Sequence, residues 1–276
     1  MNSQKYKKIL LIISILLIGY HIFLYSLSDH ETIWNNLVGL TTAVTYLIGS
    51  WYGFRNVKKI GSDSFVGKSI LALSWGALMY GIASIIWAYY VFAGLDPYPS
   101  LADVAFLPYY PLAIIGTLML LKVYKTKFNL KTNISLFLLL ALSYWISESF
   151  LGLPVFDNSS PWSSAFDVSY TLGNFFIISV AVITLYIAGG KIMKGLLILS
   201  FSFLTQAIGD FYFLTKIEAG TWWDGSMGDV FFSLSGILLS YGIIQVVEDF
   251  RSRKQVPQQN HPDMEPQLSD PTPRAF

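Results

Sequence analysis

The chain has 276 residues, of which 54% are hydrophobic and only 13% charged, with a mean hydropathy of +0.52 and a net charge of +1. This composition excludes an ordinary soluble domain, in which about a quarter of the residues are charged, and it also excludes a disordered chain. The absence of cysteine excludes disulfides and thiolate sites, and the small net charge gives no field that would attract nucleic acid. We therefore expect an integral membrane protein.

Hydropathy along the chain predicts eight transmembrane helices, because an apolar run of about 20 residues can cross a bilayer as a helix. Such runs lie at about 9–27, 33–54, 69–93, 101–121, 132–151, 166–188, 195–215 and 229–247. The first run follows three lysines, as the apolar part of a signal peptide would. However, it is long and no small-residue cleavage site follows it, so we expect it to remain as a span.

The basic residues predict the orientation of these spans. With eight spans, 17 of the 18 basic residues fall on one side of the membrane, and Lys216 is the exception. The 17 are Lys5, Lys7, Lys8, Arg55, Lys58, Lys59, Lys68, Lys122, Lys125, Lys127, Lys131, Lys191, Lys194, Arg251, Arg253, Lys254 and Arg274. Short loops rich in Lys and Arg stay in the cytoplasm. We therefore predict an all-α protein of the cell membrane with both termini cytoplasmic, comprising a membrane domain at 1–254 and a disordered polar tail at 255–276.

A short pattern, Ser-x-x-Asp-Val-x-aromatic, recurs at the start of three even-numbered spans. It begins at Ser100, Ser164 and Ser226 and places the acids Asp103, Asp167 and Asp229 at intervals of 64 and 62 residues. This period fits a helical hairpin as the repeating unit. We predict hairpins at about 69–131, 132–194 and 195–254, preceded by a degenerate hairpin at 1–68. Because Ser at the N-cap and an acid three residues later form a capping box, helix capping is the local interpretation of the pattern.

Two further acids lie within predicted spans. Glu148 and Asp210 each stand 19 residues before a repeat aspartate, and Ser84 holds the corresponding place in the first repeat. Ionisable residues inside spans usually face the bundle interior or water. Together with the nearby Gln206, Tyr144 and Tyr212, these acids predict an outward-facing acidic and aromatic ligand-binding pocket. The alternative is that both acids face the water layer outside the membrane.

The segment GLDPYPSLADVAFLPYYPLAIIG at 94–116 resembles one found in the multi-span N-terminal membrane modules of bacterial and archaeal signalling proteins, where it precedes histidine kinase, PAS or GGDEF domains. The resemblance is carried by Pro97, Pro99, Ser100, Ala102, Asp103, Phe106, Leu107, Tyr110 and Pro111, and less strongly by Gly209-Asp210-x-Tyr212. It implies a sensory input role. Since only the short tail follows the membrane domain, we expect the signal to pass through a membrane or cytoplasmic partner.

Motifs for catalysis and cofactors are not found in the sequence, so we predict no cofactor and no nucleic-acid partner. The stretch from Gly61 to Ser69 resembles a phosphate-binding loop, but five residues separate its glycines where the motif requires four. His21, His30 and His261 are scattered, which leaves a metal site undetermined. We favour a sensory or receptor-like protein in the lipid bilayer. The alternatives are an accessory subunit of a membrane complex, a transporter or proton translocator, and an enzyme such as a lipid hydrolase.

Overall fold

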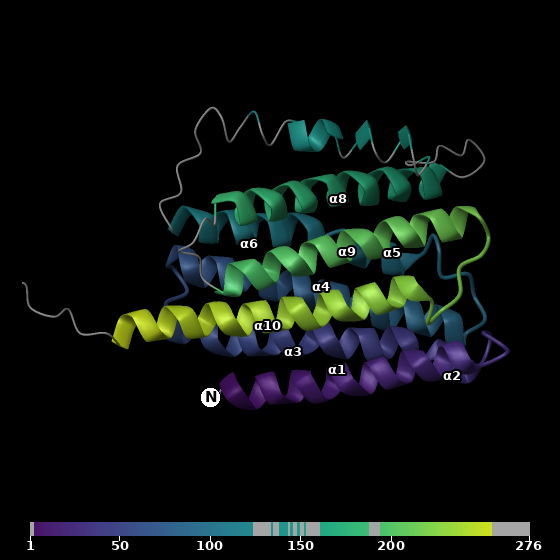
Figure 1. The fold of residues 1–276 in the computed structure, drawn as a ribbon, viewed down its shortest axis with the longest axis horizontal. Helices are drawn as coiled ribbons and strands as arrows, with labels where there is room; N and C mark the ends of the chain where they lie inside the picture. Colours follow the sequence, from purple (N-terminus) through teal and green to yellow (C-terminus); the bar gives the residue numbers. More distant parts are fainter. Residues whose placement is uncertain are drawn as a thin grey trace, which may run out of the picture.

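The computed structural model describes residues 3–123, 134, 138–142, 144–145, 148–149, 152, 161–187 and 194–255. The regular structure of this described part is helical, and its helices run alongside one another as a bundle (Figure 1). They are α1 (Ser3–Ser26), α2 (Ile33–Asn36), α3 (Val38–Ile60), α4 (Phe65–Phe92), α5 (Leu101–Phe106), α6 (Tyr109–Val123), α8 (Pro161–Ile187), α9 (Lys194–Glu218) and α10 (Met227–Gln255).

Six helical segments within the described part are long and apolar enough to cross a membrane. They are Ser3–Ser26, Phe65–Phe92, Leu101–Val123, Pro161–Tyr186, Lys194–Glu218 and Met227–Ser252. The predicted class, an all-helical multi-pass membrane protein, is therefore confirmed. Of the other two predicted spans, the one at 132–151 is described at only half of its residues, and the predicted tail from residue 256 onward lies outside the described residues.

The remaining predicted span, at 33–54, differs from the helix that forms there. The long helix α3 begins at Val38, after the short α2, and extends to Ile60. Thr42, Thr45, Ser50 and Asn56 of α3 are buried. These polar residues lower the hydropathy of α3, which is why this 23-residue helix is not among the six apolar segments.

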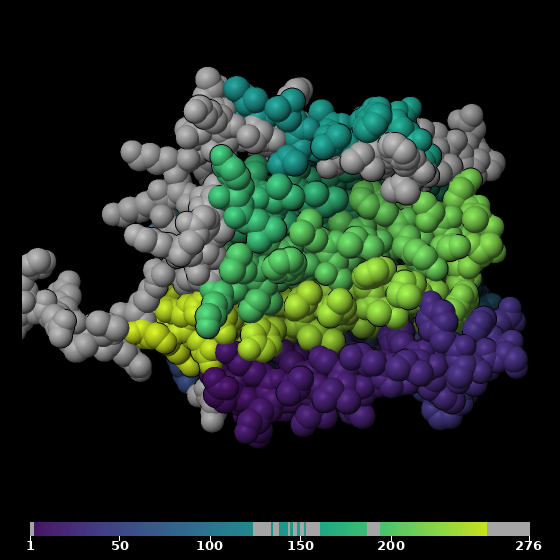
Figure 2. All heavy atoms as spheres, viewed as in Figure 1, coloured from purple at the N-terminus to yellow at the C-terminus, as the bar shows by residue number. Residues whose placement is uncertain are grey.

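Six helices form a closed ring. In order of contact around the ring they are α3, α4, α6, α8, α9 and α10, and α10 packs in turn on α3. The helix α1 lies outside the ring against α10, as the space-filling view also shows (Figure 2). Its large outward side chains, such as Leu11 and Ile22, are more than 60% exposed, as expected for a helix that faces lipid.

Glycines bring several backbones of the ring into contact. Gly49 of α3 donates its backbone N–H to Ser240 Oγ of α10 over 2.9 Å. A Cβ at this position would lie 2.6 Å from Ser240 Cα, so no side chain fits without moving the helices apart. Small residues at helix contacts are typical of membrane proteins, in which close van der Waals packing drives association.

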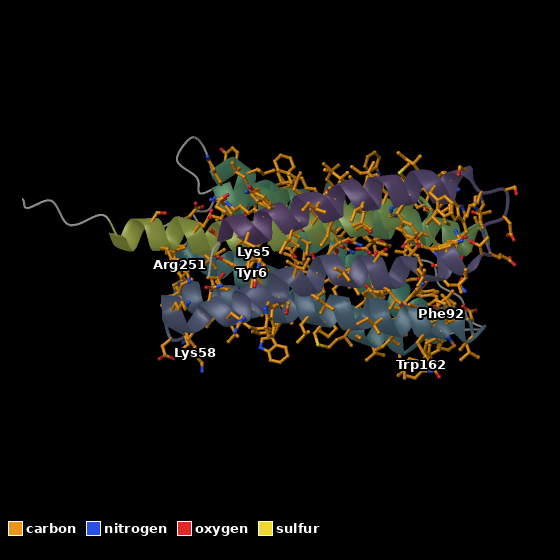
Figure 3. The ribbon with its side chains drawn as sticks, turned by 90° about the horizontal axis from the view of Figure 1, so that it is seen from below. Lys5, Tyr6, Lys58, Phe92, Trp162 and Arg251 are labelled. Carbon is orange, nitrogen blue, oxygen red and sulfur yellow. The ribbon has the colours of Figure 1, made fainter. Side chains whose placement is uncertain are left out.

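The two ends of the bundle differ in composition. Lys5, Lys58 and Arg251 lie at one end, and Phe92 and Trp162 lie at the other (Figure 3). We call these the basic end and the aromatic end. An ion pair between Lys7 and Glu248 ties α1 to α10 at the basic end.

Candidate functional site

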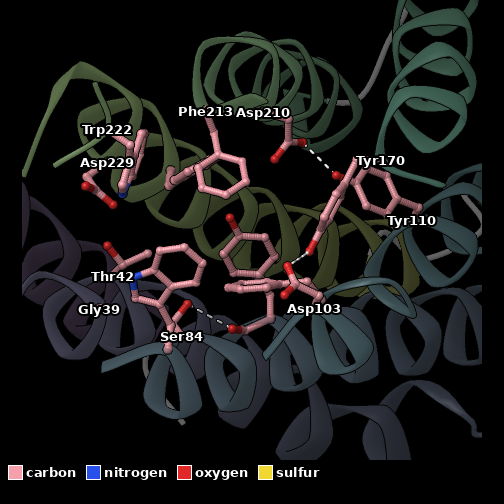
Figure 4. Close-up of a pocket in the computed structure, with 14 residues that line it drawn as sticks. Gly39, Thr42, Ser84, Asp103, Tyr110, Tyr170, Asp210, Phe213, Trp222 and Asp229 are labelled. Carbon is pink, nitrogen blue, oxygen red and sulfur yellow. Dashed lines mark hydrogen bonds between the residues drawn. The ribbon is translucent and has the colours of Figure 1, made fainter. Parts of the chain in front are cut away.

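A small cavity of about 50 Å³ lies inside the ring (Figure 4). Its lining residues belong to the helix turns nearer the aromatic end. It is walled by the first turns of α3, α6 and α10, the last turns of α4 and α9, the short α5, and α8. Three aspartates line it: Asp103, Asp210 and Asp229. Eight aromatic side chains make up most of the remaining wall: Tyr80, Trp87, Phe106, Tyr110, Tyr170, Phe213, Trp222 and Phe232.

Asp210 of α9 is buried in a network of hydrogen bonds. Its Oδ2 accepts from Tyr110 Oη at 2.7 Å, and Gln206 Nε2 donates to both of its carboxyl oxygens at 3.1 and 3.2 Å. The two α9 residues are one helical turn apart, so their side chains meet on one face. Gln206 in turn accepts from Tyr46 Oη at 2.7 Å and donates to Tyr80 Oη at 3.1 Å. This network joins α9 to α3, α4 and α6.

Asp103 caps α5 and also connects two repeats. Ser100 N donates to Asp103 Oδ2 at 2.7 Å, and Ser100 Oγ accepts from Ala102 N at 3.0 Å, so a capping box forms at the helix start. The other carboxyl oxygen, Asp103 Oδ1, accepts from Tyr170 Oη of α8 at 2.6 Å. The capping carboxylate therefore also holds α8 against α5.

Asp167, the second repeat aspartate, accepts a hydrogen bond from a tyrosine of the first repeat, just as Asp103 of the first repeat accepts one from a tyrosine of the second. Tyr98 Oη, which lies before α5 in the chain, donates to Asp167 Oδ1. Burial and the adjoining Asp167 carboxyl raise the pKa of Tyr98, so its hydroxyl remains a donor. The helix α8 begins at Pro161, three residues before Ser164, so Ser164 and Asp167 lie within α8 and not at its cap. The second copy of the pattern thus joins repeats without starting a helix.

The third copy caps α10 with a shifted geometry. Asp229 Oδ2 accepts from Gly225 N at 2.7 Å, and the buried Ser226 Oγ makes no hydrogen bond. Gly225 has a φ of +98°, a conformation that L side chains rarely adopt. Asp224 lies beside Asp229 and accepts from Trp87 Nε1 at 3.0 Å. Burial raises the pKa of Asp224, although the bond from Trp87 opposes the shift.

The structure separates the five residues of the predicted pocket. Asp210 lines the cavity and Gln206 is bonded to it, whereas Tyr212 is not among the lining residues and packs on Trp222, with Lys216 over its ring. Glu148 and Tyr144 are exposed and do not line the cavity. Glu148 therefore does not join Asp210, although Ser84, which holds the same repeat position, does line the cavity.

Sequence reasoning missed the tyrosines that complete the site. Tyr110 belongs to the segment that carries the family resemblance, and Tyr170 is the aromatic residue that ends the second copy of the Ser-x-x-Asp-Val-x-aromatic pattern. These two signals could have placed both rings near the aspartates. Tyr80 had no such signal, because it lies in the middle of an apolar helix.

Positive charge is not part of the cavity wall, since the lining residues within the described part of the chain include no Lys, Arg or His. Nor do three His, Asp or Glu side chains converge there in a way that would hold a metal ion, so far as the residues are described. His21 is buried on α1, where its Nδ1 lies 3.0 Å from the carbonyl oxygen of Leu17.

The fold and the site define a helical multi-pass membrane protein with a buried acidic and aromatic cavity. No family model, curated protein or solved structure matches the chain. The chemistry of the cavity is therefore argued from its own residues.

Proposed function

We propose that this protein is a receptor-like membrane module that binds a ligand in the cavity and signals to a partner at the opposite end of the bundle. The observation that carries the proposal is the position of the cavity. It lies near the aromatic end, between helices that continue to the basic end. Figure 3 shows the two ends and Figure 4 the lining residues. A change in packing around the ligand would therefore move helix ends at the other side.

The orientation of the module follows from its basic residues. The positive-inside rule places the end with Lys5, Lys58 and Arg251 in the cytoplasm and the cavity toward the outside. Eight alternating spans, with α3 among them, bring both termini to the cytoplasmic side. The positions of two helix ends agree with this topology: α6 ends at the basic end, where Lys122 lies over the ring of Phe65, whereas α8 begins at the aromatic end near Tyr98.

Close packing below the cavity supports a receptor over a transporter. Two to three turns from the cavity residues of α3, Gly49 contacts Ser240, and a Cβ at Gly53 would lie 1.9 Å from Ser74 Oγ. Such contacts leave little space for a solute between α3, α4 and α10. The same contacts couple these helices rigidly, because packed interiors transmit strain and do not absorb it.

Contacts at the basic end provide a route for the output. Lys7 of α1 donates to Gln245 and pairs with Glu248, both on α10, and Arg251 of α10 donates to Asn56 of α3. These bonds hold the cytoplasmic ends of three helices together. A shift of α10 at the cavity would change them and so alter the surface offered to a partner.

Spin labels at the basic end test the proposal. Because the chain has no native cysteine, Lys58→Cys on α3 and Ser252→Cys on α10 can be labelled without background in the full-length protein in nanodiscs. Asp210→Asn replaces one ionisable carboxyl of the cavity by a neutral amide and stands in for a site neutralised at Asp210. Glu218→Gln, at an exposed position on the same helix, is the matched control.

A receptor predicts that Asp210→Asn shifts the distance distribution between the two labels and that Glu218→Gln leaves it unchanged. If a folded Asp210→Asn protein gives the wild-type distribution, the cavity does not communicate with the basic end. That result would overturn the receptor proposal and favour the accessory-subunit alternative.

A further inference from the structure

The cavity contains three buried carboxyl groups and, among the described residues, no cationic partner for them. Asp103, Asp210 and Asp229 are 1%, 6% and 8% exposed, and no cationic side chain lines the cavity within the described residues. A buried carboxylate is costly unless a cation or several hydrogen bonds compensate it, and more so inside a membrane. A positively charged guest would therefore stabilise this site.

The aromatic side chains that line the cavity indicate which kind of cation would bind there. Trp87, Trp222, Phe213 and Tyr170 are among the rings that line the cavity, and Phe213 lies between Asp229 and Asp210 in Figure 4. Faces of aromatic rings attract cations, Trp most strongly, and they form the recognition sites of alkylated ammonium groups. A bare metal ion instead needs several oxygen or nitrogen ligands at close range. No such convergence of three His, Asp or Glu side chains occurs in the described part of the chain.

The volume sets the size of the guest. A cavity of about 50 Å³ holds roughly four water molecules, since each needs about 10–15 Å³. An ion with about four or five non-hydrogen atoms occupies similar space. This matches ammonium ions that carry three or four methyl groups.

The amide of Asn174 on α8 is a further polar group beside Asp210. Asn174 is fully buried, and neither its amide oxygen nor its amide nitrogen makes a hydrogen bond of ordinary geometry, although the amide interacts with the Asp210 carboxyl. It stands one turn after Tyr170, a cavity residue, and so shares the same face of α8. Buried polar atoms are nearly always satisfied, so the Asn174 oxygen calls for an N–H donor or water at this place.

We propose that the cavity binds a small alkylammonium ion, with its nitrogen beside Asp210 and Asn174 and its alkyl groups against Phe213, Tyr170 and Trp222. The inference rests on the cavity of the proposed receptor and names its ligand class, but it does not require that binding produce a signal. Carboxylates supply the charge, and the rings replace the water that the alkyl groups lose.

Calorimetric titration of the full-length protein in nanodiscs tests the proposal, in phosphate buffer free of amines. The probes are trimethylammonium chloride, tetramethylammonium chloride, potassium chloride and the neutral tert-butanol. We expect saturable binding of at least one methylated ammonium ion, with a Kd on the order of 0.1–1 mM for so small a ligand. Potassium and tert-butanol should bind at least tenfold more weakly.

Two variants and a control locate the binding. Asp210→Asn keeps the shape of the side chain and should weaken ammonium binding at least tenfold, while Phe213→Leu keeps an apolar wall and should weaken it severalfold. Glu218→Gln should bind like the wild type. Because the two variants change different parts of the wall, one remains informative if the other fails to fold.

The outcomes separate this inference from the receptor proposal. Equal binding of potassium or tert-butanol, wild-type affinity in both cavity variants, or no saturable ammonium binding would overturn the ligand class. If ammonium ions bind but the spin-label distances do not differ between wild type and Asp210→Asn, the ligand proposal is supported and the receptor proposal is overturned. If the label distances shift in Asp210→Asn but no ammonium ion binds to the wild type, the receptor proposal is supported and the ligand proposal is overturned.

Discussion

The hydroxyl of Tyr170 reaches from α8 to a carboxylate that caps another helix, and such a bond should be costly to remove. Tyr170→Phe would leave Asp103 Oδ1 buried without its donor at 2.6 Å. A buried acceptor left without its donor costs about 1–3 kcal/mol of the free energy of unfolding. We expect a lower thermal midpoint for this variant in nanodiscs, whereas Tyr89→Phe, at a residue that is 66% exposed, should match the wild type. Equal midpoints for all three proteins would show that the bond contributes nothing.

Asp224 makes stability depend on pH, because burial raises its pKa in the folded state above its unfolded value. The folded protein then holds this proton more tightly than the unfolded chain. The resulting stability is complete below the unfolded pKa of about 3.9 and is lost as the pH rises through the raised folded pKa.

We therefore expect the thermal midpoint to fall as the pH rises above about 4, by roughly 2–4 °C for each 1 kcal/mol lost. Asp224→Asn can still accept the bond from Trp87 but does not ionise, so its midpoint should fall less steeply. Thermal unfolding across this pH range measures both slopes. Parallel curves for the two proteins would rule out Asp224 as a source of the pH dependence.

At the scale of helices, the contact between α3 and α10 depends on a missing side chain. Gly49→Ala would place a Cβ 2.6 Å from Ser240 Cα, and over-packing of this kind costs about 1–3 kcal/mol. Gly19→Ala is the matched control, because a Cβ at Gly19 meets no atom within 4 Å and the substitution favours the helix. We expect Gly49→Ala to unfold at lower temperature and Gly19→Ala to be neutral or stabilising. A neutral Gly49→Ala would show that α3 and α10 can separate at little cost.

The helices themselves could be predicted from the sequence more fully than the contacts between them could be. Hydropathy found six of the spans because lipid selects apolar segments regardless of packing. The spacing of Gln206 and Asp210 placed them on one face, since helical geometry alone decides that. Glu148 was grouped with Asp210 by its distance from a repeat aspartate, but this spacing does not fix the rotation of a helix about its axis. Tyr80, Tyr110 and Tyr170 reach the site through contacts between distant segments, which no local pattern encodes.

For the whole molecule, α3 decides how many times the chain crosses the membrane. Glu31 precedes this helix and Lys58 lies near its end. If α3 spans the bilayer, single-cysteine variants Glu31→Cys and Lys58→Cys lie on opposite sides. A membrane-impermeant maleimide applied to intact cells should then label Glu31→Cys and also Glu218→Cys, which lies at the same end of the bundle.

Lys58→Cys and Ser252→Cys should react only after the cells are permeabilised, because the basic end faces the cytoplasm in this orientation. The absence of native cysteine removes background from every variant. Labelling of Glu31→Cys and Lys58→Cys from the same side would show that α3 does not cross the membrane. The topology with both termini in the cytoplasm would then be wrong. Labelling of Ser252→Cys in intact cells would show that the protein has the opposite orientation in the membrane. The acidic, aromatic cavity would then face the cytoplasm, and its ligand would have to be an intracellular cation.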